Sequence, residues 1–253
     1  MDIGMLGRFF GRLEGGNWRP PADELRFASS AGFDTVQIRS DRPGALEDEL
    51  GIGAEELGEL FDDAGLEPVL EMLVRHDGEP GCLARALRAN LQAIDAIGFL
   101  RVHIHAVGPS EAAPLLEADY AEALAVAEEA GLLFAAEHNA PGHRLLVGPD
   151  EVEALLEAVP GLGLIWDINH TAASDVPRFL ALRERFTVVH VSDTPLPETN
   201  HHLPLGRGNV DFSVLAGIDD VPLVLEIGGL PHSGGPGLDT DEALLDSLAR
   251  LRA

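Results

Sequence analysis

The chain has 253 residues, 45% of them hydrophobic and 24% charged, which is the composition of a globular protein. Seventeen basic residues against 43 acidic ones give a formal net charge of −26, and a negative field of that size opposes binding to nucleic acid. No apolar run approaches the roughly 20 residues that cross a membrane. The N-terminal sequence lacks a basic segment followed by an apolar stretch, and Cys82 is the one cysteine, so we expect no secretory signal, a cytoplasmic location and no internal disulfide.

Eight short apolar runs recur along the sequence, and a glycine precedes most of them. Such a glycine marks the end of a helix, because it accepts the left-handed conformation found there. The predicted strands begin near residues 2, 34, 66, 100, 132, 162, 186 and 221. Between them, apolar residues at three- and four-residue spacing predict helices over 54–64, 83–97, 120–130, 150–159, 176–185 and 241–251. Clusters of proline and glycine predict loops at 19–21, 107–114 and 195–208.

The spacing of these strands favours a closed barrel. Most strands start about 30 residues apart, the length of one strand–helix unit. Continuous apolar strands suit a parallel sheet covered by helices, and eight of them most simply close on themselves. The main alternative, an open doubly wound sheet, usually carries a glycine-rich phosphate loop after its first strand, and Gly15-Gly16 is not one. The predicted fold is therefore α/β, a single (β/α)8 TIM barrel that forms one domain over residues 1–253.

Metal-binding residue types stand where four consecutive predicted strands end. Strands 5 to 8 end in turn at Glu137, Asp167, His190 and Glu226. The carboxyl ends of the strands face the active site in a TIM barrel. Three carboxylates that meet there repel each other unless a cation lies between them. Three carboxylates and one imidazole favour Mn²⁺ or Mg²⁺, with Zn²⁺ or Co²⁺ as alternatives.

The same residues carry a family resemblance that spans essentially the whole chain. It rests on Glu137, Asp167-x-x-His170, His190-x-x-Asp193, Glu226 and the segment Leu-Gly-Arg-Gly-Asn-Val-Asp-Phe at 205–212. This set resembles the xylose isomerase-like barrels, which include sugar isomerases, sugar 3-epimerases, hydroxypyruvate isomerase and inosose-processing enzymes. The resemblance implies that the four strand-end residues hold the metal. It also implies that Glu137 and Glu226 transfer protons and that His170 lies beside the substrate.

One position departs from the family pattern. Family members commonly carry glutamate between the two glycines of the loop after strand 7, where this chain has Arg207. An arginine there either binds a substrate oxygen, carboxylate or phosphate, or pairs with a surface acid. His105 and His202 are further candidates for substrate contact, and Asp193 is expected to orient a metal ligand. The glycine pairs at 228–229 and 234–235 lack a basic neighbour, which favours an unphosphorylated substrate.

The favoured hypothesis is a divalent-metal-dependent isomerase or epimerase of a small keto-sugar or related polyol ketone. Glu137 and Glu226 would act jointly as acid and base, through an enediolate. An inosose-type dehydratase is the first alternative, because the same proton abstraction begins that reaction. We expect a small-molecule partner, no nucleic acid and no membrane, and the sequence leaves a homo-oligomer open.

An endonuclease IV-like metal phosphodiesterase is a further alternative, because His76, His105, His170 and the four strand-end residues fall near the zinc ligands of that family. Two features oppose it. That family carries an Asp-x-His pair after strand 7, where this chain has Asn200-x-His202. The net charge of −26 also opposes DNA binding. A non-catalytic or metal-storing barrel is the third class, and the paired glutamates argue against it.

Overall fold

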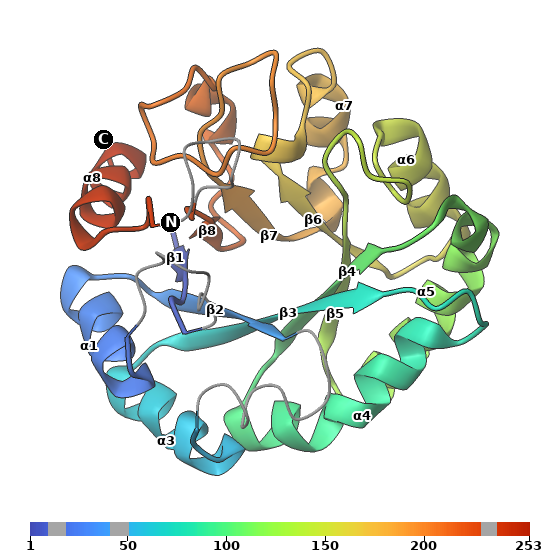
Figure 1. Cartoon of the computed structure of the whole chain (residues 1–253), viewed down its shortest axis with the longest axis horizontal. Helices are drawn as coiled ribbons and strands as arrows, with labels where there is room; N and C mark the ends of the chain where they lie inside the picture. The colour runs from blue at the N-terminus through green and yellow to red at the C-terminus, as the bar shows by residue number, and fades with distance from the viewer. Residues whose placement is uncertain (10–18, 41–50, 229–236) are drawn as a thin grey trace.

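Eight parallel strands close into a barrel in which each strand pairs with the next and β8 pairs with β1 (Figure 1). This computed structural model describes residues 1–9, 19–40, 51–228 and 237–253. The strands are β1 Ile3–Leu6, β2 Thr35–Ser40, β3 Glu67–Arg75, β4 Arg101–Val107, β5 Leu133–Glu137, β6 Gly163–Asp167, β7 Phe186–Val191 and β8 Leu223–Leu225. The predicted (β/α)8 barrel is therefore confirmed, and every strand begins within two residues of its predicted start.

The α-helices form a ring outside the strands (Figure 1). They are α1 Pro21–Ala31, α3 Ala54–Ala64, α4 Cys82–Ile97, α5 Leu116–Glu129, α6 Pro149–Ala158, α7 Val176–Ala181 and α8 Asp241–Leu251. The long connection from β7 to β8 contains only a short 3-10 helix, η4 Phe212–Leu215. Within the described ranges, no helix is long and apolar enough to cross a bilayer.

Sequence spacing missed helix α1, where a proline cluster predicted a loop. Pro21 is instead the first helical residue. Proline fits that position because a backbone N–H there would have no partner within the helix. Leu25 and Ala28 face the core, and Gly32 ends the helix in the left-handed conformation with a φ of 85°. The loop prediction therefore holds for residues 19 and 20 and fails at Pro21, where the unpredicted helix begins.

A layer of apolar side chains fills the barrel interior below its carboxyl end. These residues, which we call the apolar plug, are at most 1% exposed: Val69, Ala135, Ile165, Val188 and Val224. Side chains alternate along a strand, so the residue two positions later faces the same interior. Those later residues are Glu71, Glu137, Asp167, His190 and Glu226. The apolar pattern that packs the barrel therefore also directs this polar set toward one point above the plug.

Candidate active site and metal centre

Four side chains from consecutive strands converge above the plug. They are Glu137, Asp167, His190 and Glu226, and each offers a ligand atom within 4.8 Å of the other three. All four residues are buried, with at most 3% of their surface exposed. The site therefore concentrates three carboxyl groups and one imidazole where water is largely excluded.

Among the described residues, the atoms that face one another in this site have no hydrogen-bond partners. These unpartnered buried atoms are both carboxylate oxygens of Glu137, Asp167 Oδ2, His190 Nδ1 and Glu226 Oε2. A buried polar atom without a partner is costly and rare in native proteins. A divalent cation would satisfy all of them at once, and oxygen-rich donor sets with one imidazole suit such cations. The residues present therefore fit a metal ion.

The imidazole of His190 is held in one orientation from behind. Its Nε2 lies 2.8 Å from Gln37 Oε1, and Gln37 Nε2 donates to Glu71 Oε2 at 3.1 Å. Because an amide oxygen only accepts, Nε2 carries the proton and Nδ1 is left to face the site. Nδ1 lies 3.1 Å from Glu226 Oε2 and 3.5 Å from Glu137 Oε1. Burial lowers the pKa of His190, but the carboxylates of Glu137 and Glu226 outweigh it and raise that pKa well above its usual value.

Gln37→Leu is expected to weaken Mn²⁺ binding by about 10- to 100-fold, the range seen when a partner of a metal-bound histidine is removed. Leucine fills a similar volume but cannot accept the proton of His190 Nε2. Titration calorimetry of the metal-free protein with Mn²⁺ measures the change. Gln92→Leu, on the exposed face of α4, is the matched control. An affinity equal to that of the control would refute the orienting role of Gln37.

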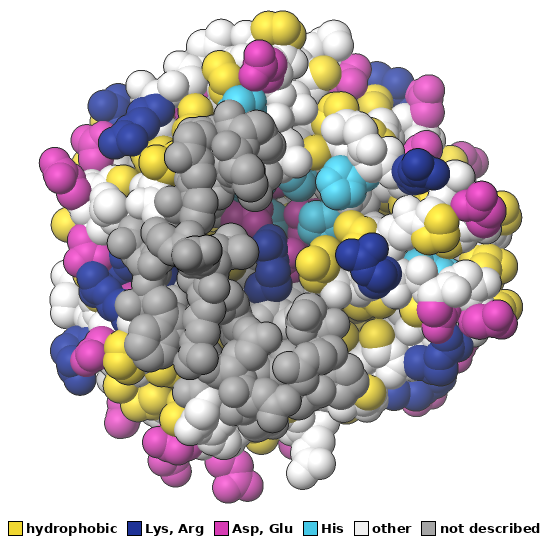
Figure 2. Space-filling view, in the orientation of Figure 1, with side chains coloured by type: hydrophobic (Ala, Val, Ile, Leu, Met, Phe, Trp, Pro, Cys, Tyr) yellow, Lys and Arg dark blue, Asp and Glu magenta, His cyan; other side chains and the backbone are white. Residues whose placement is uncertain are grey.

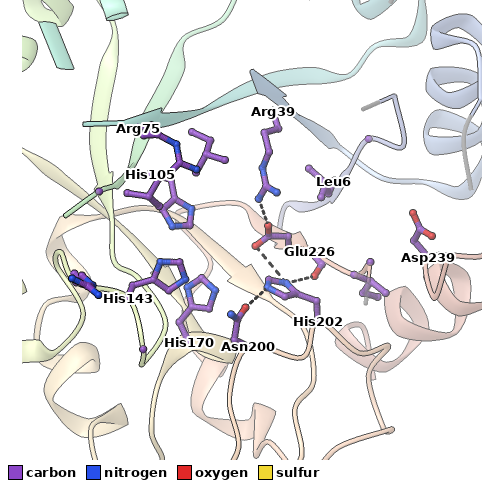
Figure 3. A pocket seen from close by; sticks show the side chains of 18 of the residues that line it. Leu6, Arg39, Arg75, His105, His143, His170, Asn200, His202, Glu226 and Asp239 are labelled. Atoms are coloured by element: carbon purple, nitrogen blue, oxygen red, sulfur yellow. Dashed lines mark hydrogen bonds and ion pairs between the residues drawn. The ribbon is translucent and has the colours of Figure 1, made fainter. Parts of the chain in front are cut away.

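Arg39 ties two acids of the site together. Its Nε lies 2.9 Å from Glu71 Oε1, and its Nη2 donates to Glu226 Oε1 at 2.6 Å (Figure 3). Burial raises the pKa of Glu226, but His190, His202 and Arg39 together lower it below its usual value. Glu226 is therefore ionised, with one oxygen held by the guanidinium and the other turned toward the metal-binding atoms.

The pKa values of Asp167 and Glu137 are shifted in opposite directions. Asp167 Oδ1 accepts a hydrogen bond from the backbone N–H of Asn169 at 2.8 Å. Burial and then the nearby Glu226 raise the pKa of Asp167 to about 7. Burial also raises the pKa of Glu137, but His105 and His190 outweigh it and hold that pKa well below its usual value. The carboxyl groups of Glu137, Asp167 and Glu226 are thus arranged to bind a cation, which would relieve the electrostatic repulsion at Asp167.

Three of the predicted substrate-contact residues line a cavity above the site. They are His105, His170 and His202. His105 Nε2 lies 2.6 Å from Asn139 Oδ1, and its Nδ1 lies 3.4 Å from Glu137 Oε1. His170 Nδ1 donates to the backbone oxygen of His138 at 3.1 Å, which leaves Nε2 at 3.2 Å from Asp167 Oδ2. His202 Nδ1 bonds the backbone oxygen of Glu226 at 3.0 Å.

Arg207 and Asp193 lie in the loop after β7, away from the metal-binding atoms. Arg207 is exposed and does not line the cavity. The carboxylate of Asp193 accepts hydrogen bonds of 2.8 to 3.1 Å from four backbone N–H groups: those of Thr194, Gly206, Gly208 and Val210. The contacts of Asp193 thus hold the loop rather than one of the four converging residues.

Sequence reasoning missed Gln37, Arg39 and Glu71. A signal for Glu71 was present, because it interrupts the apolar run of β3. Gln37 and Arg39 alternate on β2 in the same manner, and Arg39 pairs in register with Glu71. Successive side chains of a strand point alternately into and out of the barrel. That alternation, applied to β2 and β3, would have placed all three residues in the barrel interior.

The cavity has a volume of about 870 Å³ and opens at the carboxyl ends of the strands. Figure 2 shows acidic and histidine side chains at the bottom of the hollow, with basic side chains beside them. In Figure 3, Arg39, Glu226 and His202 lie on one side, and His105, His143 and His170 lie on the other. The volume is suitable for a small polar molecule placed between the two groups.

The family model described as "Xylose isomerase-like TIM barrel" matches residues 25–252. No curated protein matches the sequence significantly. Among solved structures, D-allulose 3-epimerase from Methylomonas sp. in complex with D-allulose is 17% identical, with a TM-score of 0.76 over 100% of this chain and 96% of that chain.

Two further solved structures are similar over nearly their full lengths. The IolI protein with a binding zinc atom is 18% identical, with a TM-score of 0.76 over 99% of this chain and 97% of that chain. The probable 3-DHS dehydratase AsbF from Bacillus anthracis is 15% identical, with a TM-score of 0.73 over 100% of this chain and 99% of that chain. At these identities, the likeness establishes the fold alone.

Proposed function

We propose that this chain, which belongs to the xylose isomerase-like TIM barrel family, is a divalent-metal-dependent isomerase or epimerase of a small keto-sugar or related polyol ketone. One observation carries the proposal. Glu137, Asp167, His190 and Glu226 present unpartnered buried atoms to one another at the floor of a cavity that opens to solvent. A similar structure that contains D-allulose and another that contains zinc agree with the choice of ligand classes.

A metal ion held by these four residues would supply Lewis acidity toward a substrate carbonyl and so acidify the adjacent C–H. The chain's own residues then move the proton. Glu137 ends β5 and Glu226 directly follows β8, so they reach the site from different sides. One can remove a proton and the other return one, through an enediolate. The lowered pKa values of both glutamates keep them ionised before substrate binds, as the proton acceptor requires, so the glutamate that returns a proton first has to take one up from solvent.

His170 and His105 are proposed to bind and orient the substrate oxygens. Both ring nitrogens of His202 are engaged instead, Nδ1 with Glu226 O at 3.0 Å and Nε2 with Asn200 Oδ1 at 2.9 Å. His170 Nδ1 donates to the backbone oxygen of His138, so Nε2 is the ring nitrogen left for a substrate. Burial lowers the pKa of His170, so its Nε2 is an unprotonated acceptor for a substrate hydroxyl. Burial lowers the pKa of His105, but Glu137 and Glu71 outweigh it and raise that pKa to about 9, so this imidazole is a donor at neutral pH.

The geometry argues against the phosphodiesterase alternative. That reading needs His76 as a metal ligand. Both ring nitrogens of His76 are engaged, Nε2 with Asp119 Oδ2 at 2.9 Å and Nδ1 with the N–H of Gly78 at 3.0 Å. His76 therefore holds the loop between β3 and α4 in place.

Deuterium incorporation from D₂O, followed by NMR, tests the proposal on a panel of ketoses, hydroxypyruvate and inososes. We expect Mn²⁺-loaded protein to exchange a C–H next to the carbonyl of at least one compound. Removal of metal with EDTA should abolish exchange, and Mn²⁺ should restore it. Loss of water to an unsaturated ketone would assign a dehydratase instead. Exchange that persists in protein shown to be metal-free would refute the role of the metal.

A further inference from the structure

Two arginines of the cavity wall have no acidic partner among the residues that the structure describes. Most arginines that the structure describes pair with a carboxylate, and Arg185 and Arg252 donate to backbone carbonyls. Within the described ranges, Arg75, Arg144 and Arg207 have neither kind of partner. Arg75 and Arg144 line the cavity, whereas Arg207 does not. Unpaired guanidinium groups are unexpected in a chain with 43 acidic residues, and their place in the cavity indicates a negatively charged ligand.

The two arginines extend from neighbouring points of one wall. Arg75 ends β3 and pairs in register with Val107 of β4. A Cβ at the next residue, Gly108, would lie 3.1 Å from His76 Cβ and 3.4 Å from Leu145 Cδ1. The chain neighbours of Arg75 and Arg144 thus approach the same glycine. The missing side chain of Gly108 is what lets the two segments come together.

The backbone that carries Arg144 is fixed by Asn139. Asn139 Nδ2 donates to Leu145 O at 2.8 Å and to Ala106 O at 2.9 Å, and Asn139 N donates to Leu146 O at 2.8 Å. Leu145 is also buried, at 1% exposure. The backbone next to Arg144 is therefore fixed before any ligand arrives, which reduces the backbone entropy lost on binding.

Asn139 also connects this wall to the active site. Its Oδ1 lies 2.6 Å from His105 Nε2, and the ring of the next histidine, His143, lies 6.3 Å from that of His105. Figure 3 shows Arg75 and His143 on the side of the cavity where His105 lies, across from Glu226. A ligand bound by both arginines would thus extend into the part of the cavity above the proposed metal centre.

We propose that Arg75 and Arg144 form a subsite for an anionic group of the substrate, a carboxylate or a phosphate, at the end remote from the metal centre. This inference rests on the proposed function, because it takes the cavity to be the substrate site. The planar guanidinium group binds either anion through paired hydrogen bonds. The two arginines would also offset the repulsion that a net charge of −26 exerts on an anionic substrate.

The sequence favoured an unphosphorylated substrate because no basic residue lies near the glycine pairs before the last helix. Of those glycines, Gly228 is described, and residues 229–236 lie outside the described ranges. The basic residues of the cavity wall come instead from β3 and from the loop after β5. They are distant in sequence from the glycine pairs, so the local sequence could not indicate them.

The test uses three ketoses that differ only at C6: D-fructose, D-fructuronate with a carboxylate, and D-fructose 6-phosphate. Calorimetry on the Mn²⁺-loaded protein measures their binding. We expect at least one anionic ketose to bind about tenfold more tightly than D-fructose, with a preference that weakens as salt increases. Arg75→Gln and Arg144→Gln should each remove most of that preference. Arg183→Gln, an exposed arginine before β7 at the opposite end of the barrel, should leave it unchanged.

Each outcome bears on the subsite. Tighter binding of the 6-phosphate assigns a phosphate, and tighter binding of fructuronate assigns a carboxylate. Equal binding of all three, binding of none, or a preference that survives both substitutions overturns the subsite. Deuterium exchange is measured separately. A preference for anionic ketoses without exchange on any ketose supports the subsite and refutes the proposed reaction. Exchange without a preference for anionic ketoses supports the reaction and refutes the subsite.

Discussion

Glu137→Gln and Glu226→Gln are each expected to lower interconversion of the ketose that the panel identifies by about 1,000-fold or more. Glutamine keeps the shape of the side chain but cannot accept a proton. It also takes away negative charge from a site whose acids converge within 4.8 Å. Rates are measured by NMR in D₂O at saturating Mn²⁺, with the metal content of each variant determined in parallel. Glu184→Gln, an exposed acid before β7, is the control.

The two variants also separate the roles of the glutamates. If each glutamate serves one face of the substrate, a variant that still binds metal retains exchange with one epimer and loses exchange with the other. The retained epimer then identifies the face that the remaining glutamate serves. Interconversion at the unmodified rate by both variants would refute the proton-transfer mechanism, whatever their metal content.

Asp193→Ala is expected to lower the free energy of unfolding by about 3 kcal/mol, because it deprives several backbone N–H groups of a charged acceptor. Asp193 is buried, at 1% exposure, and its carboxylate binds Thr194, Gly206, Gly208 and Val210. Gly208 is part of the same arrangement, since a Cβ there would lie 2.3 Å from Thr194 O. Urea denaturation of the metal-free protein measures the loss.

Asp211→Ala is the matched control, because the exposed carboxylate of Asp211 accepts from one backbone N–H, that of Ser213. A much smaller loss is expected for it. The Mn²⁺ affinity of folded Asp193→Ala distinguishes two roles for Asp193. An affinity close to that of the unmodified protein supports a clamp on the loop. A loss of about 10- to 100-fold would instead support the orientation of a metal ligand that the sequence suggested.

The fold was predictable because its signals are local and repeated. Glycines such as Gly65 and Gly98 end helices in the left-handed conformation and mark the strand that follows. Helix α1 was not predicted because proline is typical both of a loop and of the first turn of a helix. The sequence around Pro20-Pro21 does not distinguish these two uses.

The residues proposed to bind the metal were identifiable because each follows an apolar run at the carboxyl end of its strand. Their supports were harder to identify. Gln37 and Arg39 lie more than 150 residues from His190 and Glu226, with separations of 153 and 187. Only closure of the barrel between β8 and β1 brings β2 near them. The position of Arg207 outside the cavity depends on how a long loop folds, which strand periodicity does not describe.

The apolar plug has a consequence for the lifetime of a bound metal ion. Val69, Ala135, Ile165, Val188 and Val224 seal the barrel beneath the site, so an ion has to reach it from the cavity side. Substrate and ion would then share one opening, and a bound substrate would hinder escape of the ion beneath it. Chelators should accordingly strip the resting protein faster than the protein during turnover.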